Sequence, residues 1–457
     1  MAHNEAGVSP AVVSHNQKDK NLQESTESVH QLAFTIECIR PNFCYATITV
    51  PAEIVTTFYH AAAKSQQKST LTHGFQRGAV PIEYIKQNFT DNLIEHLKEL
   101  LLKYCVINFL CQQIQRNKLV VAGNPRLSTI HISPNDDAKF VFELSLFADL
   151  SIYEWKYFPF RPPKRKNYKD LDRQVESFLE KEKAQLSALE DDTLAIGDWV
   201  SFNISFMDDD QKPLMEHFAQ NFWFKLGEDE TESPLRQLFV GKKTGDIFFS
   251  DHHVLQEYFS DQLDTDYLFG IEITNTLSHK YFCLDHFKRT FRIKTNKDMH
   301  KKLIEVFSYR NDISQRHAMV EGALGTLLSK HRFSMPNHFV LRQKKTLLDK
   351  MQHNPDYHVY RSQKDFQSQV QKLAEKQVME TLFIDKLAYH ENLSVSDEDI
   401  KGYLNLINRP RMKEFIYFDL PSFKIQGQEY PIPTEELKRM CLREKTINYI
   451  IYHLTKK

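Results

Sequence analysis

Few residues in this sequence have the types and spacing that catalysis requires. His252 and His253 are adjacent, and because neighbouring side chains of a strand point to opposite faces, we do not expect them to share a metal ion. The acidic run Asp208–Asp210 follows a predicted strand, which favours a hairpin turn over general acid–base catalysis. Glycine-rich phosphate loops, nucleophile elbows and HExxH patterns do not occur. We therefore predict no covalent or metal-dependent enzyme, no metal site and no cofactor.

The six cysteines are scattered along the chain and include no CxxC pair. In a chain of 457 residues, this pattern is typical of reduced thiols in a cytosolic protein, and we expect most of them to be buried. The spacing also argues against a zinc site. These residues are Cys38, Cys44, Cys105, Cys111, Cys283 and Cys441.

The stretch HGFQRGAVP, residues 73–81, offers recognition rather than catalysis. Two of only 13 glycines in the chain, Gly74 and Gly78, enclose one aromatic residue and one cation. Paired glycines allow a loop to turn tightly and to project from the surface. A projecting Phe75 can fill a pocket on a partner, and Arg77 offers a forked donor to a carboxylate or a phosphate. The alternative is a plain connecting loop in which Phe75 packs into the protein's own core.

The elements that must position this loop are predicted from residue periodicity. Alternating apolar residues indicate two strands joined by a turn, and Pro51 then opens a helix with apolar residues at helical spacing. After the loop, four leucines share one face of a further helical stretch. A turn and an apolar strand complete the unit. In order, these elements are expected at residues 31–39, 44–50, 51–67, 80–114, 120–125 and 139–155, with Leu93, Leu97, Leu100 and Leu101 on the shared face.

The rest of the chain changes its pattern twice. Residues 160–169 hold two prolines and five cations, which favours an extended crossing between domains over a phosphate-binding patch. A short helix then precedes four strands predicted between residues 195 and 277. From residue 284 onward the pattern is mostly helical, with Pro336 beginning one helix and Ser396 as the N-cap of another.

The composition is that of a globular protein with several domains. Hydrophobic residues make up 41% of the chain and charged residues 26%. The 59 lysines and arginines nearly balance the 60 aspartates and glutamates, so no global field draws the chain to nucleic acid or to a membrane. No apolar run is long enough to span a membrane, and the N-terminus lacks a signal-peptide pattern. We predict a cytoplasmic protein that binds neither DNA nor a membrane.

The loop at residues 73–81 resembles the ribosome-docking loop of bacterial trigger factors, whose pattern is Gly-Phe-Arg-Lys-Gly-Lys-Val-Pro. Gln76 stands where that family has an arginine, whereas Arg77 keeps a cation. Further stretches follow the family's order at low identity, from about residue 30 to about residue 455. They include the Ala-Gly-Asn-Pro turn, the extended crossing and two C-terminal helix starts. The matching positions in the loop are Gly74, Phe75, Gly78, Val80 and Pro81.

The resemblance implies an α+β multidomain fold with an N-terminal α/β ribosome-binding domain, an FKBP-like antiparallel β domain and an all-α C-terminal chaperone domain with arms. It implies a chaperone that docks near the ribosomal exit tunnel, on protein and rRNA, and holds nascent or unfolded polypeptides for folding or export. Such a chaperone would be a monomer or a weak homodimer. The expected regions are a disordered tail at residues 1–28, the ribosome-binding domain at 29–155, an extended linker with a short helix at 156–194, the FKBP-like domain at 195–280 and the chaperone domain at 281–457.

The same resemblance assigns the docking residues. Because Gln76 removes one charge, we expect weaker and less salt-sensitive docking than in relatives with two cations. In the helical part, apolar faces become candidates for client binding, although such faces are more often core. The docking residues are Gly74, Phe75, Gln76, Arg77 and Gly78, and the client candidates are Phe339, Leu341, Leu347, Leu348 and residues 447–454.

By motif position, the resemblance also implies a prolyl isomerase cleft in the middle domain. Such an isomerase needs no nucleophile, because a water-poor aromatic cleft stabilises the twisted amide, whose uncatalysed barrier is about 18–20 kcal/mol. The family's Ile-Pro-Gly-Phe-Glu core is replaced here by residues 232–236, Glu-Ser-Pro-Leu-Arg. Two hypotheses follow, a ribosome-associated chaperone with an active isomerase or a chaperone whose isomerase has decayed and whose docking is weak or lost. The cleft residues would be Phe202, Phe222, Leu235, Tyr258 and Phe269.

Overall fold

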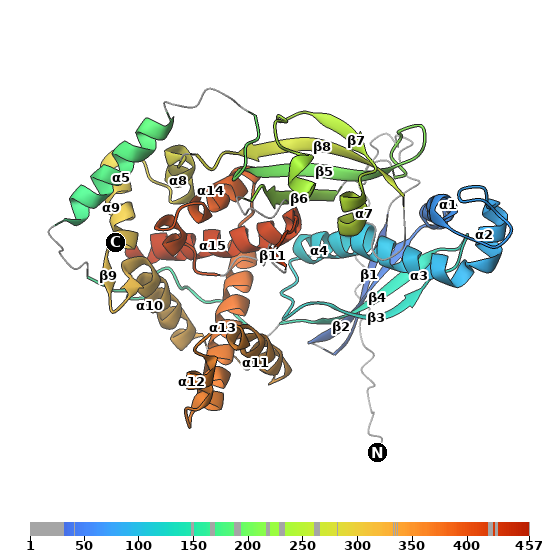
Figure 1. Cartoon of the computed structure of the whole chain (residues 1–457). Coiled ribbons are helices and arrows are strands. Elements are labelled where there is room, and N and C mark those ends of the chain that lie inside the picture. Colours follow the sequence, from blue (N-terminus) through green and yellow to red (C-terminus); the bar gives the residue numbers. More distant parts are fainter. Residues whose placement is uncertain are drawn as a thin grey trace, which may run out of the picture.

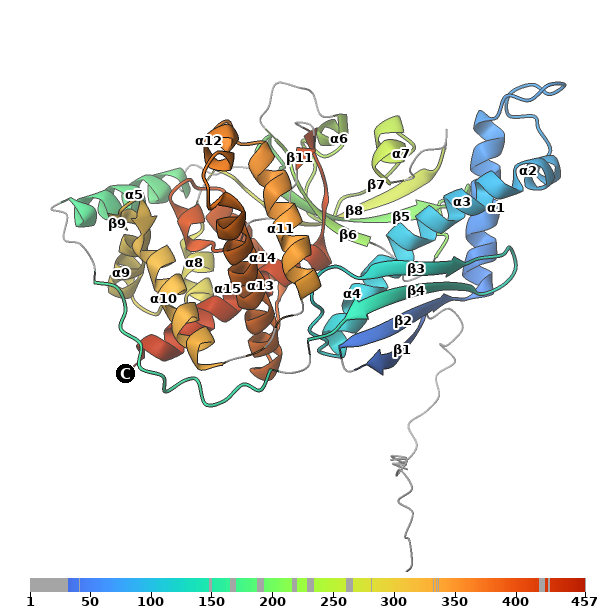
Figure 2. The same cartoon turned by 90° about the horizontal axis from the view of Figure 1, so that it is seen from below.

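The computed structural model describes residues 32–456 apart from short stretches, so the predicted tail at residues 1–28 lies outside the described residues. Its elements form an N-terminal sheet with helices, a larger middle sheet and a helical body (Figures 1 and 2). This is the predicted α+β class, with antiparallel sheets and a largely helical C-terminal part. The stretches that are not described are residues 41, 148–149, 165–169, 187–192, 216–219, 228–233, 260–265, 281, 332, 334, 336, 419–423, 426–427 and 457.

The N-terminal sheet has four antiparallel strands in the order β1-β2-β4-β3, and the helices α1 to α4 pack beside it (Figure 2). Every second residue of β2 and β4 is buried, which produces the alternation seen in the sequence. The four leucines predicted to share one helix face are all buried, which confirms that prediction. The elements are β1 (Ala33–Arg40), β2 (Phe43–Val50), α1 (Ala52–Ser69), α2 (Ile82–Asn88), α3 (Thr90–Leu101), a π-helical turn (Leu102–Val106), α4 (Ile107–Arg116), β3 (Arg126–His131) and β4 (Ala138–Ser145).

Two predictions for this region are wrong. We did not predict β3, because this edge strand is mostly exposed and so carries no buried alternating face. The last strand is also shorter than predicted, since β4 ends at Ser145. The apolar residues that follow, among them Phe147 and Trp155, pack instead into the core of the helical body. Apolar content alone therefore could not separate a strand from an extended segment that crosses to another core.

The cysteine prediction is corrected at one pair. Cys38 and Cys44 form a disulfide, because the antiparallel register of β1 and β2 places them directly opposite each other with their Cα atoms 3.9 Å apart. Cys105 and Cys441 are buried free thiols, as predicted. Burial raises the pKa of Cys105 to about 12, so this thiol is unreactive near neutral pH.

The middle sheet has five antiparallel strands in the order β13-β6-β5-β8-β7. The four strands predicted between residues 195 and 277 are confirmed, and the acidic run does form a hairpin turn, in which Asp208 Oδ1 accepts a hydrogen bond from Lys212 N at 2.8 Å. The elements are β5 (Trp199–Met207), β6 (Gln220–Lys225), α6 (Pro234–Gln237), β7 (Ile247–Ser250), α7 (His253–Phe259), β8 (Leu268–Leu277) and β13 (Ile432–Pro433).

Two features of the middle sheet differ from expectation. His252 and His253 do not lie on a strand, because α7 begins at His253, and their ring centroids are 4.4 Å apart. The edge strand β13 comes from far along the chain and pairs Ile432 with Trp223 of β6. A two-residue strand that contains a proline gives almost no sequence signal. The predicted boundary at residue 280 stays a prediction. The middle sheet contains strands from both sides of that residue.

The helical body confirms the mostly helical prediction. Ser396 caps α14 as predicted, and its backbone N–H donates to Asp399 Oδ2 at 2.8 Å in a capping box. Pro336 lies outside the described residues. The elements are α5 (Leu171–Leu186), α8 (Leu284–Thr290), α9 (Asn296–Phe307), the pair β9 (Tyr309–Arg310) and β10 (Ile313–Ser314), α10 (Gln315–Lys330), α11 (Asn337–Gln352), α12 (Tyr357–Arg361), α13 (Phe366–His390), α14 (Asp397–Ile407), a 3-10 turn (Met412–Phe415), the pair β11 (Lys424–Ile425) and β12 (Gln428–Glu429), and α15 (Thr434–Thr455).

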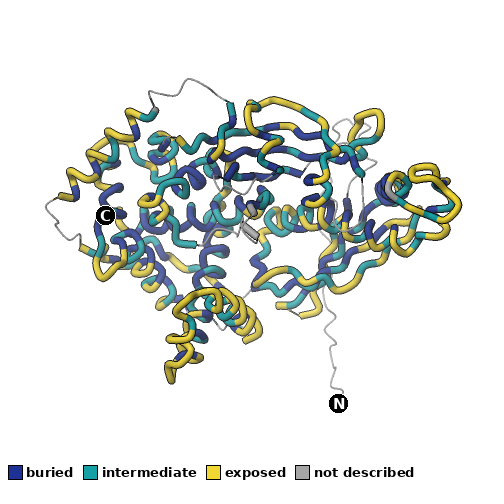
Figure 3. The backbone as a smooth tube through the Cα atoms, viewed as in Figure 1, coloured by how far each residue is buried: buried dark blue, intermediate teal, exposed yellow. Residues whose placement is uncertain are grey.

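The helices α11 and α12 and the start of α13 project from the body as an arm (Figure 1), and much of this arm is exposed (Figure 3). Of the client candidates, Leu341 on α11 is exposed, whereas Phe339 is buried. The apolar residues at the end of α15, such as Ile447 and Ile450, lie in the core of the helical body. The arm therefore offers scattered apolar side chains, whereas the isoleucines at the end of α15 belong to the core.

A buried ion pair joins the base of the arm to the last helix. Asp385 of α13 accepts hydrogen bonds from Nε and Nη2 of Arg443 of α15, each at 2.8 Å. Both residues are buried, and Arg439 Nη2 lies 3.9 Å from the same carboxylate. A buried charge is costly without its counter-charge, so Asp385 and Arg443 must stay in contact. The pair therefore fixes how α13 and α15 pack.

Candidate functional site

The loop between α1 and α2 projects beyond the end of α1 (Figure 2). Gly74 has a φ of 91° and Gly78 a φ of 81°, a left-handed conformation that other residues adopt only with strain. Nothing lies within 4 Å of a Cβ built on either glycine, so backbone conformation and not crowding requires glycine here. Two turns shape the loop, with Phe75 N donating to Thr72 O at 3.2 Å and Ala79 N donating to Gln76 O at 3.0 Å.

The side chains of this loop face outward from a fixed base. Val80 is buried, and its carbonyl accepts a hydrogen bond from Gln67 Nε2 at 2.6 Å. Phe75 is 39% exposed and only leans on Tyr84, with the ring centroids 5.3 Å apart. Arg77 is exposed and has no ion pair within the described part of the chain. The alternative in which Phe75 packs into the core therefore does not describe this loop. Gln76 is exposed beside Arg77.

The five predicted cleft residues lie in one buried aromatic cluster of the middle sheet. Their exposed fractions are 0% for Phe202, 7% for Phe222, 0% for Leu235, 8% for Tyr258 and 0% for Phe269. A large aromatic core formed by the inner faces of strands is ordinary in a β fold, but a substrate needs an open face. These five side chains present no open face to a substrate in this structure.

Phe259 is the centre of this cluster, and sequence analysis missed it. Its ring centroid lies 5.3 Å from that of Phe222, 6.2 Å from that of Phe269 and 6.4 Å from that of Phe202. Phe259 follows Tyr258 directly on α7, so the two rings point to different sides of the helix. The sequence does not predict this helix, and the motif position that assigns Tyr258 to the cleft does not include Phe259.

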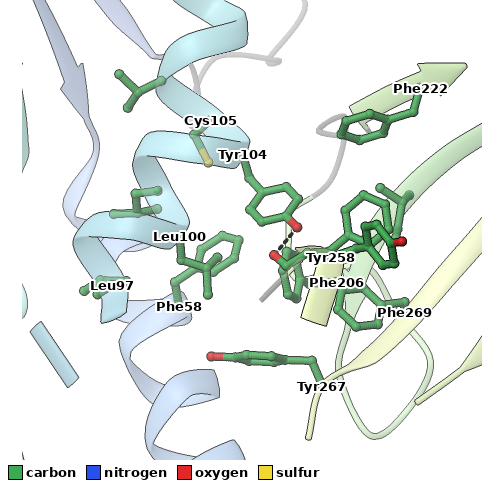
Figure 4. Close-up of a cluster of buried hydrophobic side chains, with 14 of the residues drawn as sticks. Phe58, Leu97, Leu100, Tyr104, Cys105, Phe206, Phe222, Tyr258, Tyr267 and Phe269 are labelled. Carbon is green, nitrogen blue, oxygen red and sulfur yellow. Dashed lines mark hydrogen bonds between the residues drawn. The ribbon is translucent and has the colours of Figure 1, made fainter. Parts of the chain in front are cut away.

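The N-terminal helices cover one side of the aromatic cluster (Figure 4). The ring of Tyr104, in the π-helical turn, packs edge-on against Phe206 with centroids 4.9 Å apart, and its hydroxyl donates to the Phe259 carbonyl. Lys103 Nζ donates to the Tyr258 carbonyl at 2.9 Å. Gln220 Nε2 donates to the carbonyls of Lys103 and Tyr104, at 2.9 and 2.7 Å. A π-helical turn shifts the helix register locally, which here brings Tyr104 and both carbonyls to the middle sheet.

A C-terminal segment covers another side. The Tyr258 hydroxyl donates to the Glu429 carbonyl at 3.3 Å, and the Tyr258 ring lies 4.6 Å from that of Tyr430. Burial is the main reason why the pKa of Tyr258 is raised to about 12. The space left beside Tyr104 and Phe206 is a cavity of about 20 Å³, enough for one water molecule but not for a proline.

The helix α1, which carries the projecting loop at its end, also contacts the middle sheet. Lys64 forms an ion pair with Asp209, and Ser65 Oγ accepts a hydrogen bond from Asp266 N at 2.6 Å. Phe58 lies against Phe206, with the ring centroids 5.9 Å apart. The projecting loop and the aromatic cluster are thus two ends of one packed unit.

Comparisons with known proteins give consistent results. The family model described as "Bacterial trigger factor protein (TF)" matches residues 32–181, and that of its C-terminus matches residues 295–413, together more than half of the chain. A trigger factor of Geotalea uraniireducens is 20% identical over 424 residues, covering 88% of this chain and 93% of its own. One of Chlorobaculum tepidum is 21% identical over 398 residues, covering 84% and 86%.

A solved structure described as "Promiscuous Substrate Recognition in Folding and Assembly Activities of the Trigger Factor Chaperone" aligns with 92% of this chain and 100% of its own. The sequence identity is 15% and the TM-score is 0.35. Among the described residues, no helix is both long and apolar enough to cross a membrane.

Proposed function

The chain belongs to the trigger factor family of ribosome-associated chaperones, and from this premise we propose that it docks at the ribosome through Phe75 and Arg77 and holds nascent polypeptides in the cytoplasm. The docking proposal rests on an exposed aromatic ring beside an arginine that has no ion pair among the described residues, on a loop bent by two left-handed glycines. Aromatic and arginine side chains of this kind dominate the binding energy of protein interfaces. A contact with the ribosome requires Phe75 and Arg77 to be exposed in the free chain, and both are.

Ribosome pelleting tests this proposal. The double variant Phe75→Ala with Arg77→Ala should bind ribosomes about thirtyfold more weakly, because each removed side chain is a candidate hot spot. Folding should not change, since both side chains are exposed. Leu71→Ala is the matched control, because Leu71 lies in the same loop and is 81% exposed but falls outside the glycine pair. Equal sedimentation of the double variant and the wild type would rule out docking through this loop.

For the middle domain we propose an FKBP-like fold whose isomerase activity is latent. Support comes from the aromatic cluster, which has the composition of an isomerase cleft but is covered by Tyr104 on one side and by Tyr430 on another. In the closed arrangement, defined as the state with both covers in place, the cavity beside Tyr104 and Phe206 has room for a water molecule and not for a prolyl peptide. A permanently decayed isomerase is the second candidate, and the altered loop at residues 232–236 favours it.

A protease-coupled assay with a proline-containing peptide tests latency in the full chain. We expect the cis–trans rate to stay within about threefold of the uncatalysed rate, a change of less than about 1 kcal/mol in the barrier. An acceleration of about a hundredfold or more would show that the cluster opens readily and that the closed arrangement does not limit access.

A further inference from the structure

The helical body contains a cavity of about 750 Å³ between α8, α9, α10, α14 and α15. Sites for small ligands commonly have volumes of about 300–1,000 Å³. Five aromatic residues contribute to its wall, and they are Phe291, Tyr403, Phe415, Tyr449 and Tyr452. This cavity lies outside the projecting loop and the aromatic cluster, and nothing in the docking or isomerase proposals uses it.

The cavity has a buried cation at its floor. Arg316 of α10 is 1% exposed, and burial is the main reason why the pKa of its guanidinium is lowered. Its Nη2 donates to Asn448 Oδ1, and the guanidinium lies 5.7 Å from the centre of the Phe291 ring. Its Nε has no hydrogen-bond partner among the described residues, and Arg316 forms no ion pair with them. A buried, unsatisfied donor on a cation is costly, so an acceptor that reached Arg316 would relieve this cost.

A second buried group faces the same space. Glu444 of α15 lines the cavity, and its Oε1 accepts hydrogen bonds from the backbone N–H groups of Tyr417 and Phe418, each at 2.8 Å. Its Oε2 has no partner in the described part of the chain. Burial raises the pKa of Glu444 to about 7, so this carboxyl is largely protonated below neutral pH and cannot fully neutralise the cations around it.

Two more cations stand at the rim on the turn after α8. Arg292 has a φ of 54°, and this uncommon left-handed conformation directs its guanidinium over the rings of Tyr449 and Tyr452, 5.3 and 5.8 Å from their centres. Tyr449 is itself held by a 2.8 Å hydrogen bond from its hydroxyl to Glu391 Oε2. Lys294 lies two residues further along the same exposed turn. Neither Arg292 nor Lys294 has a carboxylate partner among the residues that the structure describes.

The remaining cations of the wall are already neutralised. Arg289 pairs with Glu398 at 2.6 Å, Lys302 with Glu305 at 2.7 Å and Lys445 with Asp399 at 2.8 Å. Among the described residues, the wall cations without an ion pair are therefore Arg292 and Lys294 at the rim and the buried Arg316, which is influenced at longer range by Glu305 and Glu444. They lie among aromatic rings, so the wall is complementary to a negative charge carried beside an apolar group.

We propose that this cavity binds an acidic stretch of unfolded polypeptide in which a carboxylate adjoins an aromatic or large aliphatic side chain. The carboxylate would be held by Arg292 and Lys294 at the rim or by Arg316 below them, and the apolar side chain would pack among the tyrosine rings. This inference rests on the proposed role in holding polypeptides. It does not involve the ribosome contact. A negative result in ribosome pelleting would therefore overturn the docking proposal alone, and a negative result in peptide binding would overturn the cavity proposal alone.

Fluorescence anisotropy with a labelled peptide that carries Asp-Phe-Asp tests the proposal. We expect the wild-type chain to bind this peptide at least about tenfold more tightly than the charge-reversed Lys-Phe-Lys peptide or the Asp-Ala-Asp peptide. The double variant Arg292→Asn with Lys294→Gln should lose about tenfold in affinity for Asp-Phe-Asp. Asparagine is chosen at position 292 because it tolerates a positive φ, and both positions are exposed, so the variant should fold.

The control variant is Lys297→Gln, which makes the same substitution as at position 294 on a nearby exposed residue that does not line the cavity. Its affinity should stay within about twofold of the wild type. Equal binding of the acidic and basic peptides would overturn the proposal, as would an unchanged affinity in the Arg292→Asn, Lys294→Gln variant. Binding of free phenylacetate as tight as that of the peptide would overturn the assignment of a polypeptide as the ligand.

Discussion

Replacing Asp385 by alanine is expected to lower the free energy of unfolding by about 3–5 kcal/mol, the usual cost of breaking a buried ion pair from one side. The carboxylate accepts two hydrogen bonds from Arg443, and the guanidinium would remain buried without a counter-charge. Arg439, at 3.9 Å, would lose the same partner. Because the pair joins α13 to α15, the loss should loosen the base of the arm.

Urea unfolding followed by tryptophan fluorescence measures this effect. The control is Glu321→Ala, which removes an ion pair with Lys376 at 2.9 Å that also involves α13 but is about half exposed. That change should cost less than about 1 kcal/mol, because water already solvates both charges. The double variant Asp385→Leu with Arg443→Met removes both charges together and should recover much of the loss. An Asp385→Ala variant as stable as the control would contradict the burial argument.

Replacing Tyr104 by alanine is expected to lower the free energy of unfolding by about 3–5 kcal/mol, as large aromatic deletions in a core do. The change removes the ring packed against Phe206 and the hydroxyl bonded to the Phe259 carbonyl. Both contacts join the N-terminal helices to the middle sheet. The loss should therefore weaken the closed arrangement and expose the aromatic cluster, with less effect on either part alone.

The isomerase assay gives Tyr104→Ala a second readout. If the activity is latent, the cis–trans rate should rise at least about tenfold above that of the wild-type chain. Tyr104→Phe is the conservative control, because it keeps the ring, removes the hydrogen bond to the Phe259 carbonyl and should cost about 1 kcal/mol with no gain in rate. A destabilised Tyr104→Ala variant that stays at the uncatalysed rate would contradict latency and leave the middle domain as a spacer or a weak peptide-binding surface.

The candidate site was partly predictable. The glycine pair of the projecting loop is visible in the sequence because a left-handed backbone restricts residue type at single positions. The aromatic residues of the middle sheet were predictable as a set, since buried strands require alternating apolar residues. The sequence does not predict that other segments cover these aromatic residues. Burial of Tyr258 depends on Tyr430, which lies far along the chain and has no local signal for that contact.

Local residue patterns specify most of the helices and strands of this protein, the Ser396 cap, and the loop with Phe75 and Arg77. Each of these depends on residues close together in the chain, whose periodicity or backbone preference acts without a partner. The tertiary structure alone decided the Cys38–Cys44 bond, the cover over the aromatic cluster and the cationic cavity around Arg316. Those features depend on strand register and on helices packed from distant segments, and burial changes the chemistry of a side chain only once that packing exists.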